Sequence, residues 1–255
     1  MVFIITFFSG TPGSGKSLET AHEVEFALKT LKKNVIANVQ YNRDFILMGK
    51  EGGRFFYLDN VYFSPDFFYK YALKYHDLGK ESQTLVVIDE AQILYSPTAC
   101  KLFSQENPHY RQDWLEFYSI HRHLGYDFII VSQFDRLIDS QLRCLFEYNC
   151  VHRKANNFKL FGQLLTIFKI KLFVQIQYWY GCNEKCQSKL FIFKKKYSKI
   201  YNSYAYRDKI VAKLREKYGD EFVDRLLKSS DDDKEKVVKK EFKKEVKKVK
   251  NRVSV

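Results

Sequence analysis

One short stretch near the start of the chain limits its fold more than any other feature. Residues Gly10 to Ser17, GTPGSGKS, fit the phosphate-binding pattern G-x-x-x-x-G-K-[ST] at every position. The apolar run Val2 to Phe8 precedes this stretch, and residues from about Ser17 to Lys32 follow it with the spacing of a helix. A glycine-rich turn between a buried strand and a helix is the setting in which this pattern binds nucleotide phosphates. The stretch therefore predicts a P-loop NTPase fold.

Each position of this loop has a chemical role. Glycines let backbone N–H groups turn toward phosphate oxygens, and the helix that follows adds its positive N-terminal dipole. The ammonium of Lys16 is suited to the β- and γ-phosphates, and the hydroxyl of Ser17 to Mg²⁺. The predicted cofactors are therefore ATP and Mg²⁺. The predicted nucleotide-binding residues are Gly10, Thr11, Pro12, Gly13, Ser14, Gly15, Lys16, Ser17 and Leu18.

Two carboxylates follow another apolar run. Leu85 to Ile88 is typical of a buried strand, and Asp89 and Glu90 come directly after it. A carboxylate at the tip of a buried strand is costly unless a metal or hydrogen bonds hold it, so we predict that Asp89 faces Mg²⁺ and its water shell. Glu90 is then placed to polarise a water molecule against the γ-phosphate. This pair predicts hydrolysis and argues against a small-molecule kinase.

The stretch YDFIIVSQ predicts a further strand, which ends at Ser132 and Gln133. In a parallel sheet, a polar residue at the end of a strand beside the metal-binding strand points into the ligand crevice. We therefore predict that Gln133 senses the γ-phosphate or its attacking water. The transition state also needs an arginine, from this chain or from a neighbouring subunit. Arg136 and Arg143 are the candidates, and Arg143 is our predicted catalytic arginine.

The histidines before this strand allow two interpretations. His121 and His123 suit the capping of a helix and its loop as well as they suit phosphate sensing. The five cysteines, Cys100, Cys144, Cys150, Cys182 and Cys186, do not lie at zinc-finger spacing to these histidines. Their scatter and odd number indicate a reducing compartment without disulfides.

The predicted strands and helices alternate along the chain, which favours an α/β fold: a mainly parallel sheet with helices on both faces. From about Glu147 onward, strands carry Lys and Gln, and we predict an antiparallel β extension up to KLFIFKKK. Between the Asp89 strand and the helix at Arg111 to His121, residues Ser96 to His109 are predicted to form a polar loop. Another predicted strand is Val35 to Val39, and residues from about Phe63 to Leu78 have near-helical spacing.

The C-terminal part differs in composition. Residues 206–227 are predicted to form a helical extension of two short helices interrupted at Gly219. From Lys228 to Val255 the chain carries eleven Lys or Arg against six Asp or Glu. Val238, Phe242 and Val246 recur at helical spacing there, so this tail suits a basic amphipathic helix on an anionic surface. A solvated, disordered tail is the alternative.

Charge and hydropathy indicate the kind of partner the protein binds and whether the chain carries a signal peptide or a transmembrane helix. The net charge is +13 and aromatic residues make up 17% of the chain, which suits a polyanionic partner. The first apolar run lacks a basic leader, so it does not indicate a signal peptide. Lys159, Lys169 and Lys171 interrupt the most apolar region, so we expect no transmembrane helix.

Four stretches together resemble a known family. GTPGSGKS, VVIDEAQ, HRHLGYDFIIVSQ and KKKYSKIYNSY look like the zonula occludens toxin (Zot) domain, which is similar to the gene I assembly protein of filamentous phages. The resemblance covers residues 1–205 and implies a P-loop ATPase of the additional-strand, catalytic-glutamate division, akin to hexameric DNA pumps of the FtsK and HerA type. Family members are understood to drive virion assembly and extrusion of single-stranded DNA. They usually carry a transmembrane helix after this domain.

The resemblance and the motifs together predict an ATP-hydrolysing motor for filamentous phage assembly and extrusion. The expected partners are other copies in a hexameric ring, single-stranded DNA or phage nucleoprotein, coat or membrane assembly proteins, and an anionic membrane surface. The expected location is the host cytoplasm, at the cytoplasmic face of the membrane. Two alternatives stay open: a plasmid or chromosome DNA translocase of the FtsK-HerA type, and a nucleotide-dependent membrane scaffold that exports coat protein.

Overall fold

The computed structural model describes residues 5–157, 167, 170–201, 211–212, 214–216, 219–220 and 223–224. The chain forms two compact units, residues 1–202 and residues 203–255. The sheet, the helices and the candidate site below all belong to the first unit. None of the described helices has both the length and the apolar character needed to cross a bilayer.

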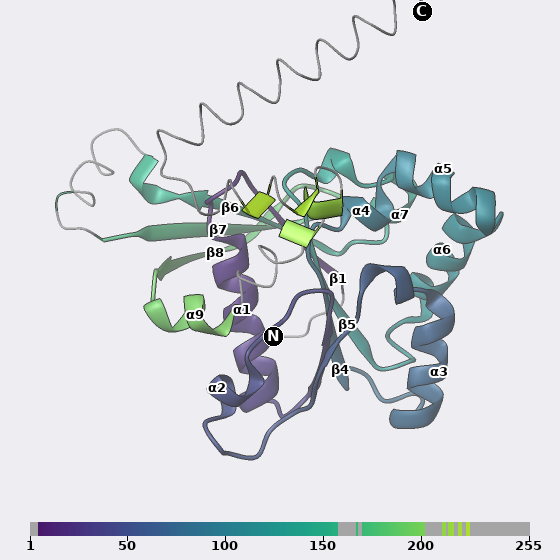
Figure 1. The fold of residues 1–255 in the computed structure, drawn as a ribbon, viewed down its shortest axis with the longest axis horizontal. Helices are drawn as coiled ribbons and strands as arrows, with labels where there is room; N and C mark the ends of the chain where they lie inside the picture. The colour runs from purple at the N-terminus through teal and green to yellow at the C-terminus, as the bar shows by residue number, and fades with distance from the viewer. Residues whose placement is uncertain are drawn as a thin grey trace, which may run out of the picture. The chain divides into compact units, whose positions relative to one another are not determined.

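A single mixed sheet forms the centre of the first unit (Figure 1). Its strand order is β3-β2-β4-β5-β1-β6-β7-β8, and every pairing from β3 to β6 is parallel. β7 runs antiparallel to β6, and β8 antiparallel to β7. The strands are β1 (Ile5–Ser9), β2 (Asn34–Ala37), β3 (Phe55–Tyr57), β4 (Thr84–Ile88), β5 (Tyr126–Val131), β6 (Tyr148–Lys154), β7 (Leu172–Trp179) and β8 (Lys185–Ile192). The predicted α/β fold with a mainly parallel sheet is therefore confirmed.

The antiparallel extension begins one strand later than predicted. We placed its start at about Glu147, but β6 pairs in parallel with β1, with Thr6 opposite Tyr148. The connection from β5 passes through α7 (Ser140–Arg143), so the chain returns to the sheet in the same direction. The extension itself therefore consists of the hairpin β7–β8.

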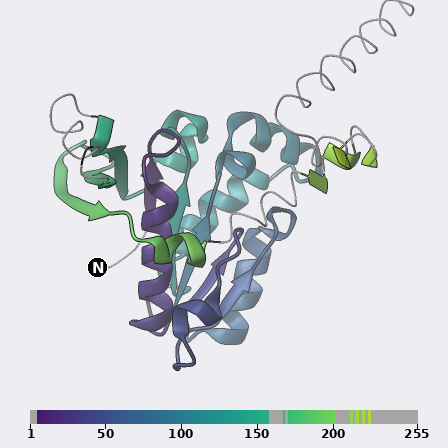
Figure 2. The ribbon, with the colours of Figure 1, turned by 60° about the vertical axis from the view of Figure 1, so that its left-hand side comes forward.

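Helices cover both faces of the parallel strands. One face carries α1 (Lys16–Lys29), α2 (Arg43–Leu47) and α9 (Lys195–Ile200), as Figures 1 and 2 show. Val24 and Leu28 of α1 pack there against Phe8 and Val87 of the sheet. Because both faces are covered, β1, β4 and β5 are buried along their whole lengths, which explains their uninterrupted apolar sequences.

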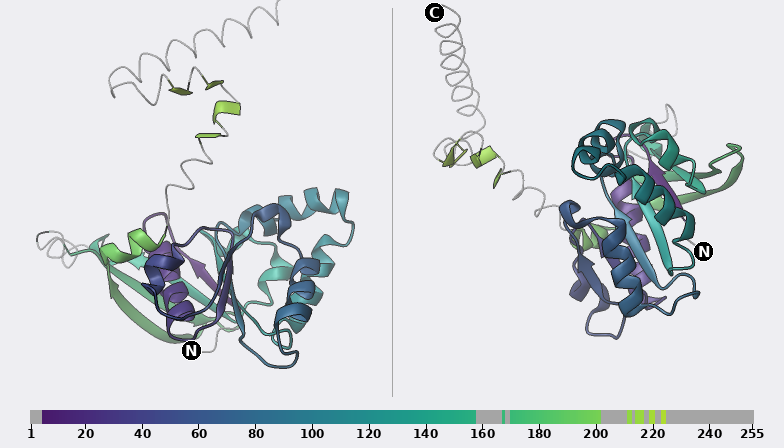
Figure 3. Two further views of the ribbon diagram at one scale, coloured as in Figure 1. Left: turned by 60° about the horizontal axis from the view of Figure 1, so that its bottom comes forward. Right: turned by 90° about the vertical axis from the view of Figure 1, so that its right-hand side faces the viewer.

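The opposite face has an aromatic core. Phe68, Trp114, Phe117 and Phe128 are fully buried there and make edge-on and stacked ring contacts. Figure 3 shows the helices of this face beside the sheet. They are α3 (Pro65–Tyr75), α4 (Gln92–Tyr95), α5 (Pro97–Glu106), α6 (Tyr110–Ile120) and α7, with short 3₁₀ turns at Asn60–Tyr62, Asp135–Leu137 and, beyond β6, Ala155–Asn157.

The predicted polar loop from Ser96 to His109 was wrong, because most of it forms α5. The Ser96 hydroxyl accepts the Ala99 N–H and Pro97 occupies the first turn, which are two strong signals for a helix start. Polar composition concealed the helix: Cys100 is its buried residue, and the remaining side chains are partly or fully exposed.

A charge cluster with two buried carboxylates attaches the β7–β8 hairpin to α1. The Lys189 ammonium on β8 lies 2.6 Å from a carboxylate oxygen of Glu19 and 3.4 Å from one of Glu23. Both carboxylates are almost fully buried, so the lysine compensates charges that water does not reach. Burial raises the pKa of Glu19. Burial also acts upward on the pKa of Glu23, but hydrogen bonds and the nearby positive charges outweigh it, so that pKa is lowered.

The C-terminal predictions fall largely outside the described residues. In the second unit, the described residues 211–212, 214–216 and 223–224 are helical, and Gly219 between them has φ of +84°. Residues 206–210 and the whole of the predicted basic tail, 228–255, lie outside the described residues. The helical extension and the amphipathic tail therefore stay predictions.

Candidate nucleotide site

The loop from Gly10 to Ser17 joins the carboxyl end of β1 to α1. The Gly10 N–H donates to the carbonyl oxygen of Gln133 at 3.0 Å, which ties the loop to the end of β5. Gly10 has φ of +141°, and a Cβ there would lie 2.5 Å from the carbonyl oxygen of His152. Only glycine fits this position.

Gly15 is the second glycine that the geometry requires. It has φ of +104°, and a Cβ there would lie 2.7 Å from the ring of Phe173 on β7. The Phe173 ring stacks on Phe191 of β8 with centroids 5.5 Å apart. The antiparallel extension therefore packs directly against the phosphate loop. No part of the loop sequence indicates this contact.

Lys16, the first residue of α1, lies near both acidic residues that follow β4. Its ammonium donates to the carbonyl oxygens of Gly10 at 2.5 Å and Thr11 at 3.3 Å. Burial lowers the pKa of Lys16, while the charges of Glu90 and Asp89 oppose that shift. The fold thus brings together one ammonium and two carboxylates from separate parts of the sequence.

Asp89 follows β4 and is held by hydrogen bonds. Its carboxylate accepts the Glu90 N–H at 2.9 Å and the Tyr201 hydroxyl at 3.5 Å. Burial, and next the charge of Glu90, raise the pKa of Asp89 to about 6. A carboxylate whose charge is this poorly solvated gains strongly from a cation, as expected for a metal ligand.

Asn38, just after β2, fixes the backbone of Asp89. The Asp89 N–H donates to the Asn38 side-chain oxygen at 2.7 Å, and the Asn38 side-chain amide donates to the Asp89 carbonyl oxygen at 2.8 Å. The same amide group donates to the side-chain oxygen of Asn60 at 2.8 Å. These contacts hold Asp89 at the sheet edge where the phosphate loop lies.

Glu90 has a strained backbone and a directed side chain. Its φ is +48°, a left-handed conformation that costs a non-glycine residue about 1–3 kcal/mol. Its carboxylate accepts a hydrogen bond from the Gln92 side-chain amide at 2.5 Å. The Gln92 side-chain oxygen in turn accepts the Ser132 hydroxyl at 2.7 Å. Such strain is often kept where a functional side chain needs a particular position.

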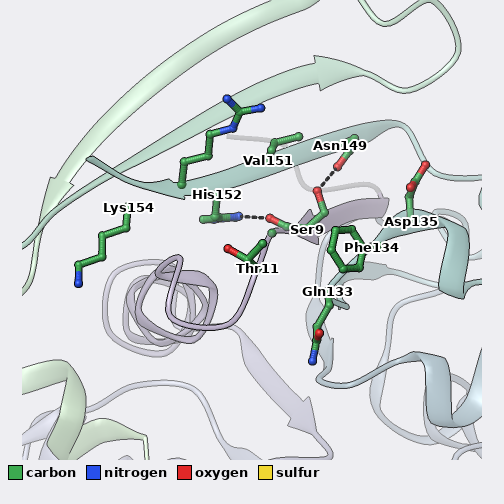
Figure 4. Close-up of a pocket in the computed structure, with 11 residues that line it drawn as sticks. Ser9, Thr11, Gln133, Phe134, Asp135, Asn149, Val151, His152 and Lys154 are labelled. Atoms are coloured by element: carbon green, nitrogen blue, oxygen red, sulfur yellow. Dashed lines mark hydrogen bonds between the residues drawn. The ribbon is translucent and has the colours of Figure 1, made fainter. Parts of the chain in front are cut away.

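β5 lies between β4 and β1, so its end lies between the two motifs. Val87 pairs with Ile129, and Phe7 pairs with Ile130. Ser132 and Gln133 thus follow the strand that separates Asp89 from the phosphate loop. In Figure 4 the side chain of Gln133 extends away from Asn149 and Asp135.

A cavity of about 490 Å³ borders the start of the phosphate loop (Figure 4). His152 lies in its wall, and its Nδ1–H donates to the carbonyl oxygen of Ser9 at 3.2 Å. Burial lowers the pKa of His152 to about 4. The Ser9 hydroxyl donates to the side-chain oxygen of Asn149 at 2.8 Å. The lining residues are Ser9, Gly10, Thr11, Gln133, Phe134, Asp135, Asn149, Val151, His152, Arg153 and Lys154.

Both candidate arginines adjoin Asp135, which lines this cavity. Arg143 on α7 forms an ion pair with Asp135, with 3.4 Å between nitrogen and oxygen. Arg136 is exposed in the 3₁₀ turn after β5. Arg153 and Lys154, which we did not predict, line the cavity together with the first loop residues. The structure therefore adds two cations of β6 to the candidates.

The two histidines lie away from the loop. His121 is the C-cap of α6 and His123 follows it, before β5 begins. β5 runs parallel to β1, so its start is at the edge of the sheet opposite the phosphate loop. The structure therefore favours the capping interpretation of these histidines over phosphate sensing.

Two observations indicate that the residues of this site fit Mg-ATP. First, Gly10 and Gly15 have backbone conformations and close contacts that exclude a side chain, and the first N–H groups of α1 have no acceptors within the helix. Second, the hydroxyl of Ser17 and the carboxylate of Asp89 are oxygen donors of the kind that Mg²⁺ prefers. Ser17 is exposed at the start of α1. Leu18 follows it, partly buried against the core of that face.

Besides Arg153 and Lys154, sequence reasoning missed four residues around this site: Asn38, Gln92, Phe173 and Tyr201. Asn38 could have been found by the rule applied to Gln133, because it is a polar residue directly after a buried strand. The contact of Tyr201 with Asp89 joins positions far apart in the chain. Only the fold brings those two together.

A comparison with protein families decides the family of this chain. Residues 4–205 match the family described as zonular occludens toxin (Zot), which is most of the chain. The chain belongs to the zonular occludens toxin family. The resemblance noted from the sequence is thereby confirmed. Among curated proteins, none matches this chain.

Solved structures give a second comparison. The N-terminal domain of zonular occludens toxin from Neisseria meningitidis has 16% identity and a TM-score of 0.46, over 79% of this chain and 100% of that one. The genome packaging NTPase B204 of Sulfolobus turreted icosahedral virus 2, in complex with ATP-γS, has 17% identity and a TM-score of 0.41, over 75% and 97%. A further ATPase domain has 11% identity and a TM-score of 0.51, over 78% and 84%. This member of the zonular occludens toxin family therefore shares its fold with that ATPase domain.

Proposed function

We propose that this protein is a Mg²⁺-dependent ATPase that drives the assembly and extrusion of a filamentous single-stranded DNA phage or a related element. One observation carries the ATPase assignment: the phosphate loop after β1, the two carboxylates after β4 and the polar end of β5 meet at one edge of the sheet. This edge is where ligands bind in open α/β sheets.

Binding would use the loop backbone and Lys16. The N–H groups at the start of α1 would donate to phosphate oxygens. Lys16 now donates to loop carbonyl oxygens, and its ammonium would transfer these bonds to the β- and γ-phosphates. Ser17 and Asp89 would hold Mg²⁺, which supplies charge neutralisation at the phosphates when it is bound.

Hydrolysis would use Glu90 and the end of β5. Glu90 would orient a water molecule and accept its proton as the water adds to the γ-phosphorus, while the bond to the β–γ bridging oxygen breaks and ADP leaves. Gln133 would sense the γ-phosphate from the strand between the two motifs. A catalytic arginine would come from Arg143 or from a neighbouring copy in a ring.

The motor role is supported by family membership and charge. Members of the family are understood to drive virion assembly, and the net charge of +13 suits a nucleic-acid path. The proposed partners are other copies of this chain, single-stranded DNA or its nucleoprotein, and coat or membrane assembly proteins. We propose that the protein acts in the host cytoplasm, at the inner face of the membrane.

Stimulated ATP turnover tests this proposal. Phosphate release is measured with Mg²⁺ alone, and with single-stranded DNA, double-stranded DNA or coat protein added. A motor that pumps phage DNA is accelerated by single-stranded DNA, and the effect weakens as salt rises. Acceleration by double-stranded DNA alone would indicate a translocase of the FtsK-HerA type. Acceleration by coat protein alone would indicate an export scaffold.

A further inference from the structure

Gln92, the first residue of α4, connects two parts of the site. Its side-chain N–H donates to the Glu90 carboxylate at 2.5 Å, and its side-chain oxygen accepts the Ser132 hydroxyl at 2.7 Å. Ser132 is 1% exposed and lies next to Gln133 at the end of β5. A continuous hydrogen-bonded chain therefore runs from the end of β5 to the carboxylate of Glu90.

The orientation of the Gln92 amide follows from its partners. A carboxylate only accepts hydrogen bonds, so the amide nitrogen faces Glu90 and the amide oxygen faces Ser132. A hydroxyl can donate to that oxygen without changing its own position. The three side chains therefore donate in one direction, from Ser132 through Gln92 to Glu90.

The backbone repeats the same connection. The Ala91 N–H, directly after Glu90, donates to the carbonyl oxygen of Val131 at 2.9 Å, directly before Ser132. Glu90 itself has φ of +48°, so its backbone departs from the usual right-handed region. Both the backbone and the side chain of this turn are therefore attached to the end of β5.

We propose that Gln92 is a positioning residue that aims the Glu90 carboxylate and couples it to Ser132 and the sensing end of β5. This inference rests on the proposed ATPase function. Gln92 acts through Glu90, and a change at Ser132 reaches Glu90 through the Gln92 amide.

Steady-state kinetics on the full chain give the first test. Gln92→Leu keeps the size of the side chain but removes both hydrogen bonds. We expect kcat for ATP to fall about 10- to 100-fold, because a misplaced catalytic group costs rate and not ground-state binding. KM, and the affinity for ATP-γS with Mg²⁺, should change by less than about twofold. Gln112→Leu is the matched control, since Gln112 makes an equivalent bond to Glu116 at 3.0 Å on the exposed surface of α6.

Thermal unfolding without nucleotide gives a second test. Ser132→Ala, Gln92→Leu and the double variant are compared by Tm. If the three side chains form one hydrogen-bonded network, the Tm of the double variant should be little lower than the Tm of Gln92→Leu, because Gln92→Leu already removes the bond to Ser132. Additive losses in Tm would overturn the connection.

The two tests separate this inference from the proposed function. If the unaltered protein hydrolyses ATP and Gln92→Leu does so at an unchanged kcat, the positioning role is wrong and the ATPase assignment stands. A loss of ATP-γS affinity as large as the loss of kcat in Gln92→Leu would also contradict the positioning role. If the unaltered protein never hydrolyses ATP, the proposed function fails and this inference fails with it.

Discussion

Asn38 and Asp89 hold each other through two reciprocal hydrogen bonds, one from the Asp89 N–H and one to the Asp89 carbonyl oxygen. The side chain of Asp89 is thereby left to face the phosphate loop, while its backbone stays fixed to the end of β2. Asn38, which we do not place among the Mg²⁺ ligands, thus sets the position of Asp89, the proposed ligand.

Loss of Asn38 should weaken the metal site. We expect Asn38→Ala to raise the Mg²⁺ concentration for half-maximal ATPase activity about tenfold, as is common when a group supporting a metal ligand is removed. Asn60→Ala is the matched control, because it removes the bond between Asn38 and Asn60 and leaves both bonds to Asp89. Equal Mg²⁺ requirements in all three proteins would contradict the role given to Asn38.

The ionised carboxylate of Asp89 should destabilise the folded protein at neutral pH. Its pKa is raised to about 6 from the ordinary 3.8, so the folded state holds a proton that the unfolded state releases between these values. Stability from this group is therefore present below about pH 4 and is lost as pH rises through 6. We expect Asp89→Asn, without Mg²⁺, to raise Tm at pH 8 by roughly 3–8 °C. This corresponds to a gain of about 1–3 kcal/mol in unfolding free energy.

The pH dependence distinguishes this cause from others. The gain in Tm should shrink to about a third when the comparison is repeated at about pH 4.5, because the wild-type carboxyl is then protonated in the folded state and only partly protonated in the unfolded state. Circular dichroism melts of both proteins across this range provide the measurement. A gain that is the same at both pH values would point to a cause other than the charge.

Lys189 should be needed to bury Glu19 and Glu23. Lys189→Met leaves two carboxylates on α1 without their positive partner, so we expect a loss of about 2 kcal/mol in unfolding free energy at pH 8. The loss should be smaller at pH 5, because Glu19 already has a raised pKa and can take up a proton. Denaturant titration at the two pH values measures both quantities.

The same helix offers a control for this substitution. Lys196 pairs with Glu25 at 2.7 Å, but the Glu25 side chain is 16% exposed, against 2% for Glu19 and 5% for Glu23. Lys196→Met should cost less than about 1 kcal/mol, as is usual for surface ion pairs. If both substitutions had the same small effect, the buried cluster would contribute nothing particular to the attachment of the hairpin.

The basic tail gives a prediction about membranes. Residues 228–255 carry eleven Lys or Arg, and each can add roughly 1 kcal/mol at an anionic surface. Deletion of residues 228–255 should therefore weaken co-sedimentation with anionic vesicles at low salt. Binding to neutral vesicles should not change. If the deletion leaves anionic binding unaltered, the tail is a solvated segment.

The sequence predicted most of the parallel sheet because the relevant signals are local. The strands at Ile5–Ser9, Thr84–Ile88 and Tyr126–Val131 are uninterrupted apolar runs, and the phosphate loop is one continuous motif. α5 was missed because its surface is polar and exposed, although Ser96 and Pro97 mark its start. Strand direction was missed at β6, since composition does not specify which way a crossover returns.

The candidate site likewise contains residues that sequence motifs predict and residues that only the fold brings together. Lys16, Asp89 and Glu90 could be named because each stands at a fixed place in a motif. Asn38 and Tyr201 reach Asp89 only because β2 and the segment after α9 fold beside β4. Side-chain partners of this kind depend on tertiary structure, and one sequence does not specify them.

The central claim is that Mg-ATP binds at the phosphate loop and that Glu90 promotes its hydrolysis. The direct measurement compares ATP binding and ATP turnover in the unaltered protein and in Glu90→Gln, with Mg²⁺, anionic vesicles and single-stranded DNA present. We predict that Glu90→Gln binds ATP with an affinity within about threefold of the unaltered protein and loses at least about 100-fold in turnover. Turnover by Glu90→Gln at the rate of the unaltered protein would contradict the account.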